Sequence, residues 1–188
     1  LERWRPLGER RYGDGTLLLG WMPSLGVGAY LHGLFGPAAH EDVVRVEGVL
    51  KQEFPDCLTE FYRYHNGSDF FRELPIYGFR RSYDRADFDA MSCNPFDILV
   101  PALVNRPMSP SGRGVKFSRY VDKSMCFAEP DGSIVRVSHA SPHVVSNRWS
   151  SLDAWLVGEV KRLSKLYDDS GKCTVNIMDT LPPPDVLS

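Results

Sequence analysis

The clearest periodic pattern along the chain lies in residues 54–71, where apolar side chains repeat at the spacing of a helix between two turn signals. Four side chains at positions i, i+3, i+4 and i+7 share one helix face: Leu58, Phe61, Tyr62 and His65. Pro55 suits the first turn, where its missing N–H removes no hydrogen bond. Asn66 and Gly67 tolerate the left-handed conformation that ends many helices, and aromatic residues at 70–71 favour a strand. The pattern predicts a helix, a tight stop and a strand, with His65 packed in the core.

Two more segments repeat at the helical period. Residues 40–54 carry an apolar stripe, and Pro55 separates this helix from the next one, which predicts a bent pair of short helices. In residues 150–167 we expect Ser150 to cap a last helix, with Asp153 at the capping-box position three residues later. The expected buried stripe of this helix consists of Leu152, Trp155, Leu156, Val160, Leu163 and Tyr167.

The second half of the chain also contains the firmest strand signals. Strands are expected at residues 115–121, 125–128 and 134–138. The sequence Pro130-Asp131-Gly132 predicts a tight turn between the last two, because proline presets one dihedral angle and glycine accepts the positive φ that follows. Val135 and Val137 then share one face of the hairpin, while Ile134 and Arg136 share the other. Shorter strands are expected within 17–36, at 70–71 and at 76–79.

Other segments are less regular. Residues 1–16 are charged and predict an edge strand or an irregular N-terminal arm, and residues 172–188, with a triple proline, predict a C-terminal surface arm. The apolar run 98–100 is expected to end at Pro101. Residues 17–36 approach the ~20 residues that a membrane-spanning helix needs. A proline, a histidine and five glycines interrupt this stretch, so we expect strands with glycine turns and no membrane span.

Composition narrows the class of protein. A chain of 188 residues, 43% hydrophobic and 24% charged, is typical of one globular domain. The formal net charge of −2, with Lys and Arg scattered, argues against direct nucleic-acid binding. The four cysteines include no Cys-x-x-Cys pair, which predicts free thiols in a reducing cytoplasm rather than zinc ligands or disulfides. The sequence starts at Leu1, so an upstream signal or domain stays an open alternative.

No motif predicts catalysis, a cofactor or a metal. His139 and His143 have the spacing of a helical metal pair, but Pro142 between them disfavours a helix and no carboxylate motif completes a site. Gly26-Val27-Gly28 lacks the third glycine and the strand–helix context of a phosphate-binding loop. A Gly-x-Ser-x-Gly nucleophile elbow is absent from the sequence as well. We therefore expect no catalytic residues, no cofactor and no metal ligands.

One acidic segment is the candidate binding site. Asp84, Asp87 and Asp89 stand beside the aromatic residues Tyr83 and Phe88 in a polar stretch that predicts a loop or a short helix. Paired carboxylates that work as general acid and base need surroundings that separate their pKa values, and this Arg- and Ser-rich stretch gives no sign of that. Two interpretations remain: a solvated loop face, or an acidic docking patch with aromatic anchors for a basic partner.

The order of several loose motifs resembles the SUKH superfamily, which groups bacterial immunity proteins with a fungal cell-wall synthesis regulator. Individually these motifs encode packing and turns, and their order and spacing are more specific. They are Val43, Glu47 and Leu50 in the first helix, Phe54-Pro55-Asp56, Tyr64-His65-Asn66-Gly67, Ile76-Tyr77-Gly78, Asn94-Pro95-Phe96-Asp97-Ile98, Pro130-Asp131-Gly132-Ser133, Asn147-Arg148-Trp149 and Ser151-Leu152-Asp153-Ala154-Trp155-Leu156.

The resemblance implies an α+β fold with a mixed, mostly antiparallel sheet and flanking helices, formed by residues 1–188 as a single domain. It also implies a non-catalytic bacterial immunity protein that neutralises a cognate polymorphic toxin, in many cases a nuclease, by direct binding in the cytoplasm. We expect a monomer or a weak dimer. The alternatives are an intracellular scaffold or regulatory module and, second, a small-molecule-binding or enzymatic domain.

Overall fold

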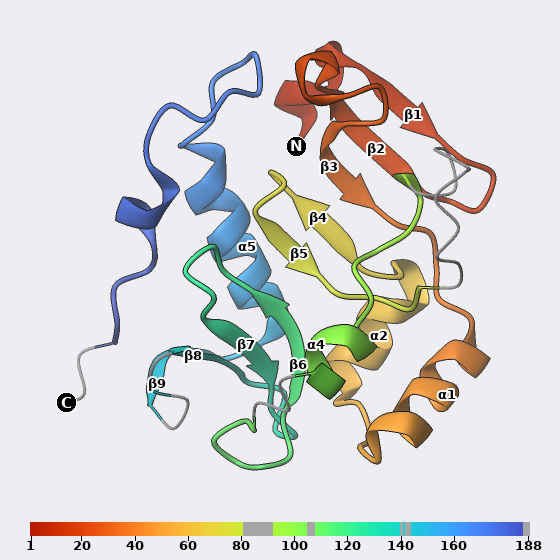
Figure 1. The fold of residues 1–188 in the computed structure, drawn as a ribbon, viewed down its shortest axis with the longest axis vertical. Coiled ribbons are helices and arrows are strands. Elements are labelled where there is room, and N and C mark those ends of the chain that lie inside the picture. The colour runs from red at the N-terminus through yellow and green to blue at the C-terminus, as the bar shows by residue number, and fades with distance from the viewer. Residues whose placement is uncertain (81–91, 105–107, 140, 142–143, 186–188) are drawn as a thin grey trace.

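The computed structural model describes residues 1–80, 92–104, 108–139, 141 and 144–185, and in this part of the chain the strands form one nine-stranded sheet. The strands lie in the sheet in the order in which they occur along the chain, and each pairs antiparallel with the next (Figure 1). They are β1 (Glu9–Arg11), β2 (Leu17–Trp21), β3 (Tyr30–Leu34), β4 (Ser68–Phe70), β5 (Leu74–Ile76), β6 (Val115–Arg119), β7 (Met125–Ala128), β8 (Ile134–Val137) and β9 (Val145–Trp149).

The helices flank this sheet and confirm the expected α+β class. In Figure 1, α5 runs beside the β6–β9 half of the sheet, and α1, α2 and α4 gather on the other side of β6. The α-helices described are α1 (His40–Leu50), α2 (Asp56–Tyr64), α4 (Leu99–Val104) and α5 (Leu152–Ser164). Short 3-10 helices occur at Glu2–Leu7, Pro23–Leu25 and Ile177–Thr180. An isolated bridge between Gly78 and Asp97 adds a parallel contact to the otherwise antiparallel strand pairing.

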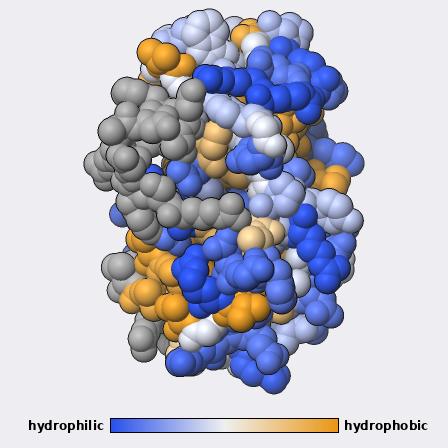
Figure 2. All heavy atoms as spheres, turned by 90° about the vertical axis from the view of Figure 1, so that its right-hand side faces the viewer, coloured by the Kyte–Doolittle hydropathy of each residue, from blue (hydrophilic) through white to orange (hydrophobic). Residues whose placement is uncertain are grey.

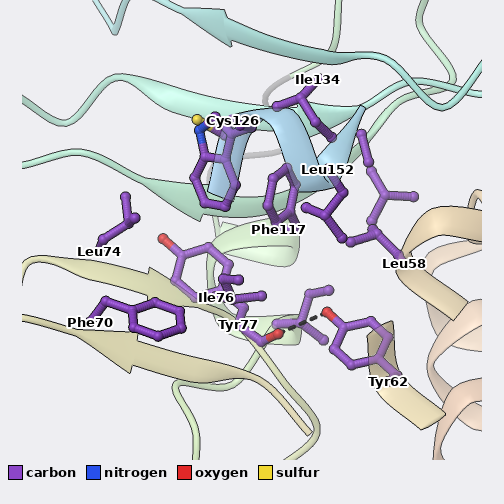
Figure 3. Packing of buried hydrophobic residues seen from close by; sticks show 14 of the residues in the cluster. Leu58, Tyr62, Phe70, Leu74, Ile76, Tyr77, Phe117, Cys126, Ile134 and Leu152 are labelled. Carbon is purple, nitrogen blue, oxygen red and sulfur yellow. Dashed lines mark hydrogen bonds between the residues drawn. The ribbon is translucent and has the colours of Figure 1, made fainter. Parts of the chain in front are cut away.

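The main core lies between the sheet and the helices. Side chains from β5, β6, α2 and α5 meet there, as Figure 3 shows for Ile76, Phe117, Leu58 and Leu152. Phe117 packs edge-to-face on the buried Trp155 ring of α5, with 5.0 Å between ring centroids. The Tyr62 hydroxyl donates a hydrogen bond to the Tyr77 carbonyl at 2.7 Å, so this buried hydroxyl has a partner inside the core.

The β7–β8 hairpin confirms the predicted turn and the predicted alternation. The Gly132 N–H donates to the Glu129 carbonyl at 2.9 Å, and Gly132 has a φ of 81°, the positive value that only glycine adopts without strain. Ile134 points into the main core, whereas Val135 and Val137 belong to a second cluster with Met125 and Phe127 on the other face. Both faces of this hairpin are therefore buried.

The structure corrects the expected end of the first predicted helix. Helix α2 ends at Tyr64, and His65 is already extended, so Asn66 and Gly67 do not form the helix stop. The Asn66 side chain instead holds the backbone of Phe79, donating from Nδ2 to its carbonyl at 2.9 Å and accepting from its N–H at 2.6 Å. Gly67 does have a positive φ, 82°, and a Cβ there would lie 2.6 Å from the Ile76 carbonyl oxygen. Glycine is thus required for close backbone packing.

Three smaller predictions are also wrong in detail. The cap of α5 is Ser151, whose hydroxyl accepts from the Ala154 N–H at 3.1 Å, and not Ser150. Pro101 lies inside α4, because a proline is tolerated in the first turn of a helix. The strand expected at 76–79 spans Leu74–Ile76 instead.

The two ends of the described chain make contacts that the sequence does not predict. Trp4 is buried, and its indole N–H donates to the Asp168 carbonyl at 2.8 Å. At the other end, the carbonyl groups of Pro182 and Pro183 accept hydrogen bonds from Arg136 and Asn147. Long-range hydrogen bonds therefore hold the N-terminal segment to the chain that follows α5 and the C-terminal segment to β8 and β9.

Candidate partner-binding surface

The predicted acidic patch of Tyr83, Asp84, Asp87, Phe88 and Asp89 lies outside the residues that the structure describes. The residues that flank this segment are described, and both Arg80 and Ser92 line one cleft. The patch therefore stays a prediction, while its two flanks direct attention to the cleft.

This cleft, called the Asp69 cleft below, has a volume of about 380 Å³, within the range of small-ligand pockets. Three parts of the chain form it: the β2–β3 region, the β4–β5 hairpin and the segment that follows residue 91. The lining residues are Leu18, Gly28, Tyr30, His32, Gly33, Phe35, Asp69, Arg72, Arg80, Ser92, Asn94, Pro95 and Phe96.

Asp69 is the chemically unusual group of the cleft. It pairs with Gly33 across β3 and β4, so a residue without a side chain stands directly opposite. Its Oδ1 atom is buried and has no hydrogen-bond partner among the described residues. Burial raises the pKa of the Asp69 carboxyl to about 6, with Arg72 opposing and Glu73 adding to this effect. A perturbed carboxyl in a cleft is a recognised mark of a functional site.

The hairpin turn next to Asp69 is strained. Phe71 and Arg72 have φ values of 57° and 59°, which residues with side chains rarely adopt. Two buried contacts hold Phe71: its N–H donates to His32 Nδ1 at 3.3 Å, and its carbonyl accepts from the Tyr167 hydroxyl at 3.0 Å. Burial lowers the pKa of His32 to about 3, so the ring is neutral and its Nδ1 accepts this bond. The surroundings thus impose a turn that places Arg72 at the cleft.

A second hollow, called the α1–α4 groove below, lies between the end of α1, α4 and the start of β6. Its volume is about 290 Å³. The lining residues are Val49, Leu50, Lys51, Gln52, Ala102, Leu103, Met108, Ser109, Gly112, Gly114, Val115 and Lys116.

Local structure explains how the groove is built. Helix α1 ends at Leu50, and the next residue, Lys51, takes the left-handed conformation with a φ of 56° and turns the chain away. The Gln52 side chain then donates to the Arg113 carbonyl and ties the end of α1 to the loop before β6. The Ser109 hydroxyl accepts from the Gly114 N–H at 2.7 Å and closes that loop.

Several large apolar side chains are exposed in and beside the groove. Val49 is 46% exposed, Leu103 44% and Met108 68%, and Val100 beside them on α4 is 53% exposed. Figure 2 shows apolar residues gathering on the lower part of this face, where α1 and α4 lie. Contiguous exposed apolar residues of this kind mark interaction surfaces.

The charge of the groove is positive. Lys51 and Lys116 line it, and no Asp or Glu is among the described residues that do so. Lys116 is half-buried, and this burial lowers the pKa of its ammonium group. The nearby Arg119 guanidinium lowers this pKa further by charge repulsion. In the described part of the chain no carboxylate pairs with Lys116.

The remaining candidate residues form no site in the part of the chain that the structure describes. No group of three or more His, Cys, Asp or Glu side chains in this part is placed to hold a metal ion, and His143 lies outside it. His65 packs against Phe61, with 5.9 Å between ring centroids. Cys57, Cys126 and Cys173 are free thiols. Among the described helices, none has the length and apolar character required to cross a membrane.

No protein-family model matches the chain, and no curated protein is significantly similar to it. The proposed function therefore depends on the Asp69 cleft and the α1–α4 groove. The sequence pattern predicts neither surface. In the sequence, Lys116 is only one residue of an expected strand, and Asp69 only precedes the aromatic residues of another expected strand. Only the alternation of Asp69 with the buried residues Ser68 and Phe70 hinted that its side chain points to the other face of the sheet.

Proposed function

We propose that the chain is a non-catalytic protein-binding domain, and specifically a bacterial immunity protein that neutralises a cognate toxin by direct binding. The observation that carries the proposal is the exposed apolar surface of the α1–α4 groove. A free protein exposes such a surface at a cost, because apolar area in contact with water is unfavourable, and covering it drives association.

The SUKH resemblance supports the same function in a different way. The residues that carry the resemblance are occupied with packing: Asn66 holds the Phe79 backbone, Gly67 fits against Ile76, and Tyr77 is buried in the core. Residues used in this way specify a fold. Recognition of a partner then falls to the variable surface.

The acidic patch at residues 83–89, outside the described residues, stays a second candidate contact for the toxin. Acidic residues at the rim would speed association with a basic toxin, and the aromatic residues would supply contact area. Reversing the charges of Asp84, Asp87 and Asp89 to lysine is expected to weaken toxin binding, as measured by calorimetric titration. Equal affinity for the variant and the parent chain would remove this patch from the interface.

The proposed function is tested in the native host. The tagged chain is used to capture bound protein, the bound protein is identified, and its gene is expressed with and without the chain. An immunity protein restores growth to cells that express the toxin. If the bound protein is not toxic, the chain is a scaffold or regulatory module instead.

Small-molecule binding at the Asp69 cleft is the second candidate function. Its support is the combination of a cleft of about 380 Å³, a buried carboxyl with a raised pKa and a strained turn beside it. A metabolite library screened by thermal shift tests this candidate. Asp69→Asn is expected to abolish the shift produced by any true ligand of the cleft.

A further inference from the structure

We propose that the α1–α4 groove binds an apolar peptide segment of a partner protein and that a carboxylate of this segment pairs with Lys116. This inference rests on the proposed protein-binding function and names the chemistry of the partner. A partner that binds the groove has to match two of its features: the apolar walls and the positively charged lysine that lines the groove with them.

Lys116 defines the charge of the occupant. Its ammonium group is half-buried on β6, its neighbour Arg119 has the same charge, and no described carboxylate pairs with it. Removing water from an ammonium group is costly unless a counter-ion replaces the water. A carboxylate from the partner supplies that counter-ion, whereas a Lys or Arg from the partner would add a further positive charge.

The walls define the rest of the occupant. Val49 and Leu103 face the groove from two different helices, and Met108 stands at the loop between them and β6. Methionine adapts its shape to different apolar partners, which suits a recognition surface. A free anion or a nucleic-acid backbone would pair with the lysines and leave these apolar side chains exposed to water. A peptide with apolar residues on both sides of an Asp or Glu satisfies both features.

The test uses a displayed library of random 12-residue peptides and the purified full chain. Peptides selected on the chain are expected to be enriched in Asp or Glu flanked by apolar residues. Affinities are then measured by fluorescence anisotropy with one labelled acidic peptide from the selection and with a copy in which its carboxylate residue is replaced by the corresponding amide.

Variants of the chain locate the binding site. Lys116→Glu is expected to lower the affinity for the acidic peptide by at least about tenfold, since a hydrogen bond to a charged group contributes about 1.5–3 kcal/mol. Leu103→Ser is expected to lower the affinity for the acidic peptide and for its amide copy by the same factor. Lys123→Glu makes the same charge change in the β6–β7 turn, outside the groove, and is expected to leave binding within twofold. Thermal melts confirm that each variant is folded.

The inference is overturned if the library yields no binder, if the selected peptides lack acidic residues, or if Lys116→Glu and Lys123→Glu have the same effect. None of these results contradicts the proposed function. The proposed function is contradicted by a different result, namely that the chain captures no toxin in its host. A toxin that binds Lys116→Glu as tightly as the parent chain leaves the immunity role in place and removes only the groove from its interface.

Discussion

The Asp69 cleft and the α1–α4 groove each hold a partly desolvated ionisable group, and they differ in how that group can be relieved. Asp69 can take up a proton, because burial raises the pKa of its carboxyl to about 6, close to neutral pH. The ordinary pKa of the Lys116 ammonium group is 10.5, and burial and then the nearby Arg119 guanidinium lower it, because both disfavour the charged form. Below about pH 6, protonation thus neutralises Asp69 within the free chain, whereas Lys116 has no described carboxylate as a partner and needs one from outside.

This contrast explains why the groove, and not the cleft, carries the proposed function. The Asp69 carboxyl becomes neutral by binding a proton only as the pH falls below about 6, and at pH 7 it is mostly ionised and is expected to destabilise the chain. An ammonium group among exposed apolar side chains needs a counter-ion whenever it is charged, because no described carboxylate supplies one.

The largest effect is expected at Gly67, which packs closely against Ile76 and against Pro95 of the Asp69 cleft. Gly67→Val should destabilise the chain by about 3 kcal/mol, because it combines a positive φ of 82° with a Cβ 2.6 Å from the Ile76 carbonyl oxygen. Urea unfolding followed by circular dichroism measures the change.

Gly158→Ala is the matched control for Gly67→Val. Gly158 lies in α5, has an ordinary helical φ and has no atom within 4 Å of a Cβ position, so alanine should leave the stability unchanged or raise it by up to about 1 kcal/mol. If Gly67→Val unfolds at the same urea concentration as the parent chain, the close packing between Gly67 and Ile76 is wrong.

The role of Gly67 also shows what the sequence can and cannot reveal. Local patterns determine the β7–β8 hairpin, since Pro130, Asp131 and Gly132 form its turn from adjacent residues and the strand period sorts Val135 from Ile134. The need for glycine at position 67 was also visible, but its reason was not. That reason is a contact with Ile76 and Pro95, and contacts between distant residues leave no local signal.

The same limit applies to the two surfaces. The burial of Asp69 depends on its pairing with Gly33, which the β3–β4 register sets. The groove depends on α4, and the sequence pattern ended that element at Pro101 instead of continuing a helix through it. The triple proline near the C-terminus predicted a surface arm, yet its carbonyl groups accept hydrogen bonds from Arg136 and Asn147. Each of these features is decided by which strands become neighbours.

The second prediction concerns the cleft. The pKa of Asp69 rises from 3.8 to about 6 on folding, so the folded chain binds this proton more tightly than the unfolded chain. The stabilisation is fully present below the unfolded pKa and is lost as the pH rises through the folded pKa. Asp69→Asn should therefore raise the free energy of unfolding at pH 7 by about 2 kcal/mol, a value reduced for partial exposure of the group. At pH 3.5 the two chains should be nearly equal.

Urea unfolding at several pH values between 3.5 and 7.5 measures this difference. Asp122→Asn provides a control of opposite sign. Burial raises the pKa of Asp122, but hydrogen bonds from Ser124 and Arg136 outweigh burial and leave that pKa lowered. Its loss should therefore destabilise the chain at pH 7 and have less effect in acid. If the Asp69→Asn and parent curves stay parallel over this range, the carboxyl is solvated and the cleft loses its distinguishing group.

The smallest effect on stability, and the sharpest for the comparison, is expected for Lys116→Met. This change removes the half-buried charge, keeps most of the side-chain volume and should raise the free energy of unfolding by up to about 1 kcal/mol. Because the same ammonium group is proposed to pair with the partner, the variant should bind an acidic peptide at least about tenfold more weakly while it becomes more stable. Lys123→Met, at an exposed turn, should change neither quantity. If Lys116→Met instead destabilised the chain, Lys116 would already have a counter-ion within it, and the groove would have no unmet charge to offer a partner.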